Sequence, residues 1–528
     1  MNLLIFTVLR TYSTMIGTSI RCKQLLLLSL LFLGVPTQNL TNNSDTTTGF
    51  LPCDALISVG LGDRILTART QAYEPRIESY FSSNARYHPW CLFQPQNTKE
   101  VSLAISTLAK TGHGAGDWHI AIRSGGHGFP GASNIARGIT IDLGNMNSSS
   151  YNSESKIASL GPGARWRNVY RDLLDKHNVT VTGGRDGGVG VGGFLLGGGI
   201  SYYTGTNGFG SDTVVNYEVV LANGTVVQAN TSSNADLFKA LKGGGSNFGI
   251  ITRFDAEATP AANLAYGQHI VSSNHSDAII ENIVDFTGKV ADFPTDHLIT
   301  LYIHQPGTSD TIILSIRVNT QGNMNTTAFD GLQTIPAISS SWNTTSLADA
   351  SDASQIDSGS ASASAALTFL STPSILKRAA EVNKALNSQL TFLLGADSFS
   401  TTMVLQPMPT IYSDISQAKG GSMLPPFTSN AVMWTGGVNV PGGNDTALAI
   451  AETEFLAAMA HLREFARKSG ALVDFVYMNY AHPGQDALGS YGAESVQWMR
   501  EIAAEYDPQE FFQKRVPGGF KISRVEAA

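Results

Sequence analysis

Three glycine-rich segments in the first half of the chain limit its fold more than any other feature. They span residues 122–128, 183–199 and 241–252. In the first segment, a predicted strand leads directly into two glycines that are followed by His127. Glycine lets backbone N–H groups approach an anion such as a pyrophosphate closely. The same pattern also fits an ordinary polar turn, and one short motif does not separate these two interpretations.

The second segment contains the spacing of a dinucleotide-binding fingerprint, Gly-x-Gly-x-x-Gly, at Gly188, Gly190 and Gly193. That fingerprint requires a helix whose N-terminus faces the pyrophosphate. A glycine inside a helix costs about 1 kcal/mol, and three follow one another at 197–199. We therefore predict an extended backbone lying against a flat cofactor. Because three glycine clusters recur within one domain, a cofactor site is favoured over chance.

Length and composition describe an ordered, multidomain protein. The chain has 528 residues, of which 42% are hydrophobic and 14% charged, and this length suggests two to four domains. Its formal net charge is −8 and it has no run of Lys or Arg. It therefore lacks the positive surface expected of a nucleic-acid-binding protein, and we exclude nucleic acid as a partner.

The N-terminus has the pattern of a secretory signal peptide over residues 1–38. Arg21 and Lys23 precede an apolar run that is too short to span a membrane. Met15 stands where such a signal usually starts, so residues 1–14 are an upstream extension or a misassigned start. A polar stretch follows at once, which argues against the alternative of a buried N-terminal helix. We expect a secreted protein.

Further features agree with secretion. Cys22 would be removed with the signal, which leaves Cys53 and Cys91 to form a disulfide in an oxidising compartment; two buried free thiols are the alternative. Asn-x-Ser/Thr acceptors for glycosylation occur at Asn39, Asn42, Asn147, Asn178, Asn223, Asn230, Asn274, Asn325, Asn343 and Asn444.

The patterning changes along the chain. A helix is predicted from Thr98, and a strand over 119–123. Short, glycine-punctuated strands typical of a mixed sheet follow at 138–143, 179–182 and 214–221. From about residue 259, longer alternating runs indicate an antiparallel sheet, with strands at 298–303 and 312–318. The Ser/Ala-rich segment 339–366 is predicted to be a surface excursion. Later elements are a helix over 446–469 closed by Gly470, a strand over 474–480 and a helix over 492–506.

Four segments together resemble the berberine-bridge-enzyme-like flavoproteins of the vanillyl-alcohol-oxidase superfamily, in their fungal secreted or secondary-metabolism branch. They are residues 123–142, 183–199, 242–252, and the motif Tyr477-Met478-Asn479-Tyr480 with 507–512. The resemblance spans nearly the whole mature chain, although residues 260–440 match only in their general residue pattern and share no motif. It implies an α+β fold, with a two-part FAD-binding domain of the PCMH type and a substrate domain whose antiparallel sheet is covered by helices. The implied boundaries are 50–257 for the FAD-binding domain, 258–460 for the substrate domain and 461–525 for a C-terminal segment that returns to the FAD-binding domain.

The resemblance also implies how FAD is held. His127 would carry a covalent 8α-histidyl bond, and residues 124–128 would hold the pyrophosphate. Many relatives have a second link through a cysteine at the position of Asp186, so we expect a single link here. Further cofactor contacts are expected at Arg123, Ser124, Gly125, Gly126, Gly128, Ser133, Gly188, Val189, Gly192, Gly193, Gly198, Gly249, Ile250 and Asn479. Val189 matches the position that admits dioxygen in relatives, which favours an oxidase; an ordinary packing valine is the alternative.

Catalytic residues are expected in the Tyr477-Met478-Asn479-Tyr480 motif. Strand alternation places Tyr477 and Asn479 on one face and Tyr480 on the other. A tyrosine whose pKa is lowered by its neighbours could take a proton from the substrate while a hydride leaves for the flavin. Tyr202 and Tyr203 are second candidates for lining the pocket.

The predicted function is an FAD-dependent oxidase. It would remove a hydride from a C–H bond of a small alcohol, phenolic or polyketide-like molecule and reduce dioxygen to hydrogen peroxide. An oligosaccharide lactol oxidase, an oxidative cyclase and a non-catalytic secreted flavin-fold binding protein remain alternatives. No Gly-x-Ser-x-Gly motif or metal-ligand spacing supports a serine hydrolase or a metal site. We expect a monomer without a membrane span.

Overall fold

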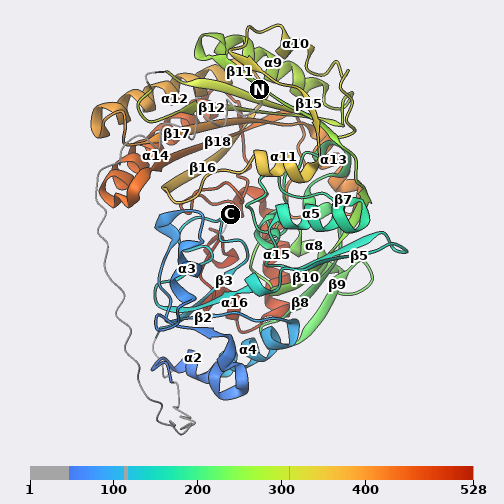
Figure 1. Ribbon diagram of the computed structural model, residues 1–528, viewed down its shortest axis with the longest axis vertical. Coiled ribbons are helices and arrows are strands. Elements are labelled where there is room, and N and C mark those ends of the chain that lie inside the picture. Colours follow the sequence, from blue (N-terminus) through green and yellow to red (C-terminus); the bar gives the residue numbers. More distant parts are fainter. Residues whose placement is uncertain (1–46, 112–116, 309, 527–528) are drawn as a thin grey trace, which may run out of the picture. The chain divides into compact units, whose positions relative to one another are not determined.

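Three β-sheets organise the protein. The computed structural model describes residues 47–111, 117–308 and 310–526. Two sheets come from the first half of the chain and one from the second, and all three belong to a single unit that starts at Thr47 (Figure 1). The expected signal peptide and the acceptors Asn39 and Asn42 lie outside the described residues.

The first sheet carries the first glycine loop at the end of one of its strands. Its strands, in spatial order, are β1 (Ile65–Leu66), β2 (Cys91–Phe93), β4 (Gly138–Asp142) and β3 (His119–Arg123). β2 and β3 pair in parallel with β4, whose residues are all buried, as expected for a parallel strand covered on both faces. Helix α4 (Thr98–Lys110) begins at Asn97, whose side chain accepts the N–H of Glu100. The helix predicted from Thr98 is therefore confirmed.

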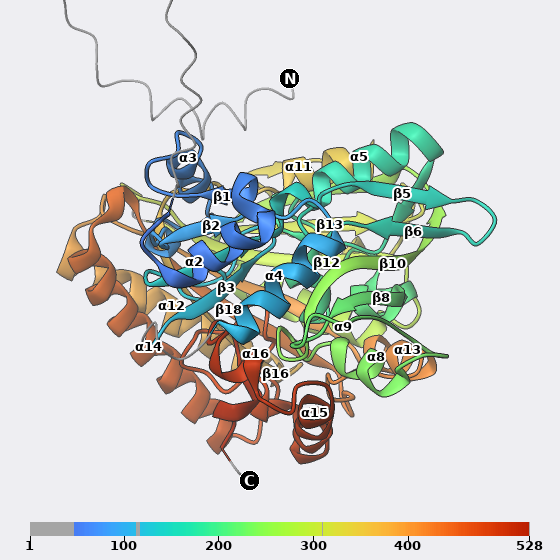
Figure 2. The ribbon, with the colours of Figure 1, turned by 90° about the horizontal axis from the view of Figure 1, so that it is seen from below.

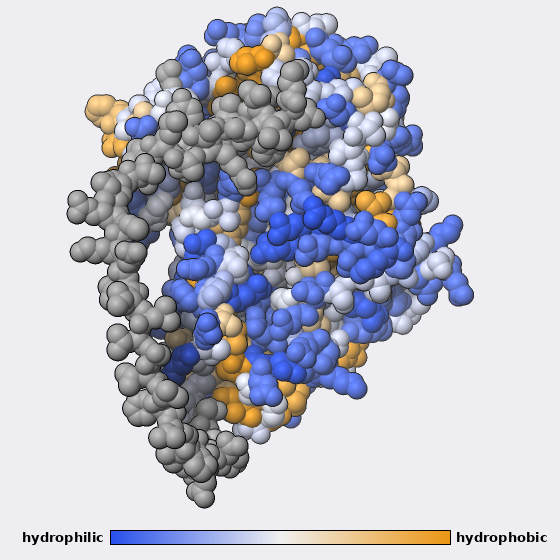
Figure 3. All heavy atoms as spheres, viewed as in Figure 1, coloured by the Kyte–Doolittle hydropathy of each residue, from blue (hydrophilic) through white to orange (hydrophobic). Residues whose placement is uncertain are grey.

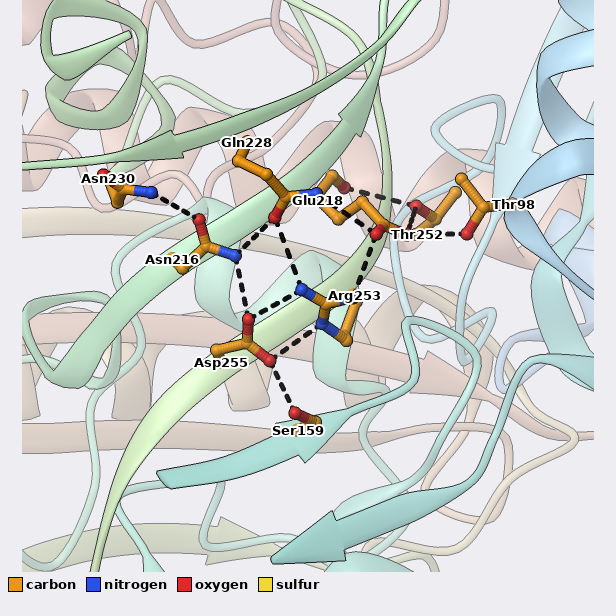
Figure 4. A network of polar contacts seen from close by, with 9 residues as sticks. All are labelled: Thr98, Ser159, Asn216, Glu218, Gln228, Asn230, Thr252, Arg253 and Asp255. Carbon is orange, nitrogen blue, oxygen red and sulfur yellow. Dashed lines mark hydrogen bonds and ion pairs between the residues drawn. The ribbon is translucent and has the colours of Figure 1, made fainter. Parts of the chain in front are cut away.

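The second sheet is antiparallel and exposes one face. Its strands are β5 (Ser149–Asn152), β6 (Ile157–Leu160), β10 (Ile250–Pro260), β8 (Val214–Val220) and β9 (Val226–Asn230), and β7 (Val179–Val181) also pairs with β10. On the exposed face, the guanidinium of Arg253 donates to the carboxylates of Glu218 and Asp255 (Figure 4). This polar network crosses the four neighbouring strands β6, β10, β8 and β9, while the opposite face packs into the core.

The third sheet is antiparallel and has nine strands. They are β14 (Ser339–Ser340), β11 (Leu264–Ser272), β13 (Ile312–Asn319), β12 (Asp296–His304), β17 (Ser400–Met408), β18 (Ala431–Val440), β16 (Ala361–Leu370) and β19 (Leu472–Val473), with β15 (Asn343–Thr345) beside β11. Three helices cover one face: α9 (Ser276–Lys289), α12 (Pro373–Leu394) and α14 (Asp445–Lys468) (Figure 1). Trp434 of β18 stacks on Phe455 of α14 in this layer. The predicted helix-covered antiparallel sheet is confirmed.

The C-terminal segment returns to the first two sheets. Helix α15 (Ala493–Tyr506) packs against α8 (Ala235–Leu241) (Figures 1 and 2). Phe511 and Phe512 of α16 (Phe511–Lys514) lie in the same apolar cluster as Ile120 of β3. The carbonyl of Arg515 accepts the N–H of Ile120 in β3. Beyond α16, the buried ammonium of Lys521 donates to the carbonyl of Ser246 in the third glycine segment.

The remaining helices are short or amphipathic. They are α2 (Leu51–Leu56), α3 (Tyr73–Glu78), α5 (Trp166–His177), α6 (Val191–Leu196), α7 (Thr204–Asn207), α8 (Ala235–Leu241), α10 (Asp330–Gln333), α11 (Leu347–Ala353) and α13 (Thr410–Ala418). α5 buries Trp166 and Leu173 and turns charged side chains outward, and Figure 3 shows the hydrophilic surface over it. Among the described residues, no helix is long and apolar enough to cross a membrane.

Two predictions of local structure are corrected. Segment 339–366 is a surface excursion only in part: α11 buries Leu347 and Ala350 and packs on α5, whereas residues 340–341, 343–344 and 355–358 are exposed. The strand over 474–480 is absent: β19 ends at Val473, and a turn follows. There the polar groups of Tyr477 and Asn479 bond to the 194–199 backbone instead of continuing the sheet.

The predicted disulfide is present, and it joins α2 to β2 through Cys53 and Cys91. Replacing both cysteines by serine removes a cross-link between residues 38 positions apart, which should lower the free energy of unfolding by about 4 kcal/mol in the chain-entropy model. Thermal unfolding of the variant and of the wild type with and without reductant checks this value. Reductant should bring the wild type to the melting temperature of the variant and leave the variant unchanged.

Burial of Lys521 should make stability depend on pH. Burial lowers its pKa from 10.5 to about 7. Between these values the unfolded chain binds a proton that the folded protein does not, so the free energy of unfolding should rise with pH in this window. Lys521→Met should flatten that rise in urea unfolding at pH 7 and pH 9, whereas Lys468→Met, at an exposed position, should not. An unchanged slope in Lys521→Met would contradict the assignment.

Candidate active site

The first two glycine segments lie back to back. The hydroxyl of Ser124 donates to the carbonyl of Pro162 at 2.6 Å and accepts the N–H of Gly192 at 3.1 Å. A Cβ atom on Gly125 would come within 2.6 Å of the backbone nitrogen of Gly190. Neither loop has room for a side chain here, which explains why the sequence has glycine at both positions.

One arginine ties the two loops together. The guanidinium of Arg165 donates to the carbonyl of Gly125 at 2.7 Å and also to the carbonyl of Gly188. Both contacts come from the residue just before α5. The two loops are therefore held by a charged donor as well as by backbone contact.

The side chain of Arg123 lies beneath the first loop. It is fully buried, donates to the carbonyl of Arg76 and the hydroxyl of Ser79, and lies over the ring of Tyr80 at 3.6 Å. Tyr80 in turn donates to the carbonyl of Ser133. These contacts give Arg123 a supporting role through its side chain, and they fix the far end of the loop.

His127 lies at the edge of the loop against an aromatic ring and a carboxylate. Its imidazole stacks on Phe81, with ring centroids 4.0 Å apart, and its Nε2 lies 3.8 Å from Oδ2 of Asp186. Burial lowers the pKa of His127, and Asp186 opposes this shift. The ring is thus neutral at neutral pH. Asp186 is itself fixed, because its carboxylate accepts the N–H groups of Gly188 and Ile356.

The second glycine segment is not wholly extended, which corrects the prediction. Residues 191–196 form α6, which starts after Gly190 and ends at Gly197. Burial of Val191 and Leu195 in the core stabilises this single turn and a half despite its two glycines. The triple glycine ends it as argued, since Gly198 and Gly199 have φ of +104° and +89°. The helix is too short for the dinucleotide-binding motif.

Tyr477 holds the backbone next to α6. It is buried, and its hydroxyl accepts the N–H of Gly199 at 2.9 Å and the side-chain N–H of Asn479 at 3.1 Å. Asn479 also donates to the carbonyl of Phe194. Burial raises the pKa of Tyr477, so the expectation of a lowered pKa is wrong for this tyrosine. Its contacts give it a structural role.

Tyr480 has a different environment. It is half-buried, and its hydroxyl accepts a hydrogen bond from Arg185 at 3.0 Å. The same guanidinium donates to Oε1 of Gln406 at 2.6 Å and to Nε2 of His297 at 2.9 Å. Tyr480 therefore contacts the positive charge of Arg185, which His297 of β12 and Gln406 of β17 hold in place. These two side chains lie on the face of the third sheet opposite its helices.

Sequence reasoning did not find Arg185, His297 or Gln406. Arg185 stood next to Asp186 within a segment already singled out, so its position was a usable signal. His297 and Gln406 lie on separate strands of the third sheet and carry no local motif. Only the fold brings these three residues together.

His297 is the neutral member of the group formed by Arg185, Gln406 and His297. Burial and the neighbouring Arg185 hold its pKa well below its usual range. Because Nε2 accepts from Arg185, the ring proton is on Nδ1, which has no hydrogen-bond partner among the described residues. The ring of Tyr202 packs edge-on against His297, and its hydroxyl bonds to Ser354. Tyr202 therefore contacts His297, which in turn bonds to Arg185. Tyr203 is half-buried.

The other expected cofactor residues fall into two groups. Gly126, Gly128, Val189 and Gly193 belong to the paired loops or to the start of α6. Gly198, Gly249 and Ile250 pack within the protein: Gly198 faces Leu424, Gly249 faces Val219, and Ile250 lies in the core beside α4. Among the described residues, no three His, Cys, Asp or Glu side chains are grouped to hold a metal ion.

The paired loops fit a flavin dinucleotide. Gly193 and Gly128 are exposed, and a Cβ atom on Gly193 would meet nothing within 4 Å. Open glycine backbone beside a neutral histidine and a tyrosine–arginine pair suits an anionic cofactor with a redox-active ring. Fold and site thus agree with the FAD-binding oxidoreductase that the sequence resemblance implies.

Comparison with known proteins agrees. Residues 89–230 match the FAD binding domain family. The FAD-dependent monooxygenase drtC of Aspergillus calidoustus is 31% identical over 491 residues, which cover 90% of this chain and 91% of the relative. The chain belongs to the same family of FAD-binding oxidoreductases as this relative.

Solved structures share the fold. The 6-hydroxy-D-nicotine oxidase of Arthrobacter nicotinovorans has a TM-score of 0.70 and 18% identity, covering 85% of this chain and 96% of that one. Wild-type BBE-like 1 of Physcomitrella patens has a TM-score of 0.67 and 16% identity, covering 87% and 97%. The glucooligosaccharide oxidase of Acremonium strictum has a TM-score of 0.68 and 16% identity, covering 90% and 99%, and is described with a 6-S-cysteinyl, 8α-N1-histidyl FAD.

The loop contact predicts a contrast between two glycine variants. Gly125→Ala should push the paired loops apart, because its Cβ would meet the backbone of Gly190, and should lower both thermal stability and FAD content. Gly193→Ala should keep the stability of the wild type, since the space beside it is open. Melting temperature and bound flavin per chain, from absorbance, check both. Equal stability of the two variants would contradict the back-to-back arrangement.

Proposed function

We propose that this protein is an oxidase that removes a hydride from a C–H bond of a small alcohol, phenolic or polyketide-like molecule and passes the electrons to dioxygen. The observation that carries this proposal is the hydrogen bond from Arg185 to Tyr480, in the motif that also reaches α6 through Asn479. When bound, FAD would accept the hydride and return two electrons to dioxygen, giving hydrogen peroxide. Relatives named as monooxygenases and oxidases support chemistry at a reduced flavin with dioxygen.

Tyr480 is the proposed base. Its half-buried hydroxyl can contact a substrate, while Arg185 balances negative charge on the phenol oxygen. Gln406 and His297 hold the guanidinium in place from the large sheet, so the base is positioned by neighbours that do not themselves move protons. Tyr477 is excluded from this role by its burial and by the two N–H groups that it accepts.

FAD attachment through His127 is part of the proposal. The neutral, partly exposed imidazole at the loop edge is suited to act as a nucleophile. In the glucooligosaccharide oxidase the histidine link is through N1, the ring nitrogen also called Nδ1. With Asp186 in place of a cysteine, one link is proposed, and the loops around Ser124 to Gly128 would hold the pyrophosphate.

We also propose that the protein passes through the secretory pathway. The disulfide between Cys53 and Cys91 requires an oxidising compartment to form and persist, in agreement with the signal-like N-terminus and the glycosylation acceptors.

Acid precipitation tests the attachment. Yellow colour and flavin fluorescence should stay with the precipitated wild-type protein and pass to the supernatant for His127→Ala. His119→Ala, a histidine in the same sheet but before the loop, should behave like the wild type. Flavin that stays with His127→Ala after acid would contradict the assignment.

Two tyrosine variants test the base. With a substrate found by screening alcohols, phenols and oligosaccharides for hydrogen peroxide release, Tyr480→Phe should lower the rate of anaerobic flavin reduction by about 10²- to 10⁴-fold. Tyr477→Phe should lower the melting temperature, because the N–H of Gly199 loses its acceptor, with a smaller effect on rate. The reverse ranking of the two rates would assign the base to Tyr477.

A further inference from the structure

The carboxylate of Asp186 faces the histidine that is proposed to bind FAD, and the inference drawn from it rests on that proposed attachment. Oδ2 of Asp186 lies 3.8 Å from Nε2 of His127, with side chains 13% and 24% exposed. No other acidic side chain among the described residues forms an ion pair with His127. A carboxylate therefore stands at one edge of the imidazole.

The position of Asp186 does not depend on the histidine. Oδ1 accepts the N–H of Gly188 at 2.6 Å, and Oδ2 accepts the N–H of Ile356 at 3.1 Å. The first contact closes the second glycine loop, and the second reaches the segment between α11 and β16. Two backbone donors thus fix the carboxylate before any contact with the imidazole is considered.

The ring itself is also confined. Phe81 stacks on one face of His127, with ring centroids 4.0 Å apart, which covers that face and orients the imidazole plane. Of the charged groups around it, Asp186 attracts a positive ring and Arg165 opposes one. The guanidinium of Arg165 is directed at the carbonyls of Gly125 and Gly188, whereas the carboxylate faces Nε2.

We infer that Asp186 is a positioning residue for covalent attachment of the flavin. At 3.8 Å the carboxylate is beyond hydrogen-bond distance of Nε2, but its negative charge favours the tautomer with the proton on Nε2. Nδ1 of His127 then carries the lone pair. The same carboxylate balances the positive charge that develops on the ring when Nδ1 forms a bond.

The attachment balances as an oxidation of the flavin methyl group. With FAD bound, a bond would form between Nδ1 of His127 and the 8α carbon, one C–H bond of the methyl group would break, and the imidazole would lose its N–H proton. The electron pair and these two protons would pass to the flavin and then to dioxygen, giving hydrogen peroxide. Asp186 ends unchanged, because its part is to orient the ring and balance its charge.

The rate of attachment tests this role. Full-length apoprotein from riboflavin-limited cells is mixed with FAD, and acid-stable flavin is followed over time by in-gel fluorescence. Asp186→Asn should slow attachment by about tenfold or more, the factor that corresponds to a shift of one pKa unit in the differential stabilisation of the charged ring. Asp352→Asn removes a partly buried carboxylate of α11 that pairs with Arg171, and should attach FAD at the wild-type rate.

A second measurement separates positioning from loop folding. In a His127→Ala background, where no bond can form at this residue, adding Asp186→Asn should change the affinity for FAD by less than about twofold. A loss of affinity as large as the loss of attachment rate would assign Asp186 to holding the loop and overturn the inference. Wild-type attachment in Asp186→Asn would overturn it too, while leaving the oxidase and its His127 bond intact. A wild-type protein without acid-stable flavin would overturn the attachment itself, and the inference with it.

Discussion

The contact between Gly125 and Gly190 is the constraint on which the rest of the site depends. Two loops from different sheets meet there without side chains between them, and Arg165 donates to carbonyls of both. Backbone donors of the two loops are thereby brought to one place. His127 and Asp186 belong to these two loops, and their side chains lie 3.8 Å apart.

The nine-stranded sheet supplies the other side of the site. The face covered by helices forms a hydrophobic core, in which Trp434 of the sheet stacks on Phe455 of α14. Its opposite face presents His297 and Gln406 to Arg185. Arg185 belongs to the second glycine segment, so this one guanidinium connects the paired glycine loops to the nine-stranded sheet and to Tyr480 near the C-terminus. A positive charge shared among three distant parts of the chain suits a site that must hold a phenol oxygen steady while a proton moves.

Elements with strong local signals were predictable. α4 has an asparagine cap and a regular apolar stripe, and α14 ends at Lys468, followed by the cap residue Ser469 and by Gly470 in the left-handed region. Elements whose stability depends on packing against distant parts of the chain could not be predicted. α11 has little apolar periodicity, and its burial comes from packing on α5. α6 forms although two of its six residues are glycine, because burial of its apolar side chains outweighs their weak helix propensity.

The sequence by itself determined that glycine loops precede and surround His127, that Cys53 and Cys91 are candidates to pair, and that a tyrosine motif lies near the C-terminus. These are local patterns, and their chemistry depends on neighbours in the chain. Tertiary structure decided which tyrosine is only half-buried and faces a cation. Tyr477 and Tyr480 are three positions apart, yet one accepts N–H groups of the backbone and of Asn479 in the core while the other meets Arg185. Hydrogen bonding and charge act through space, and the groups that separate these two phenols come from strands and loops far away in sequence.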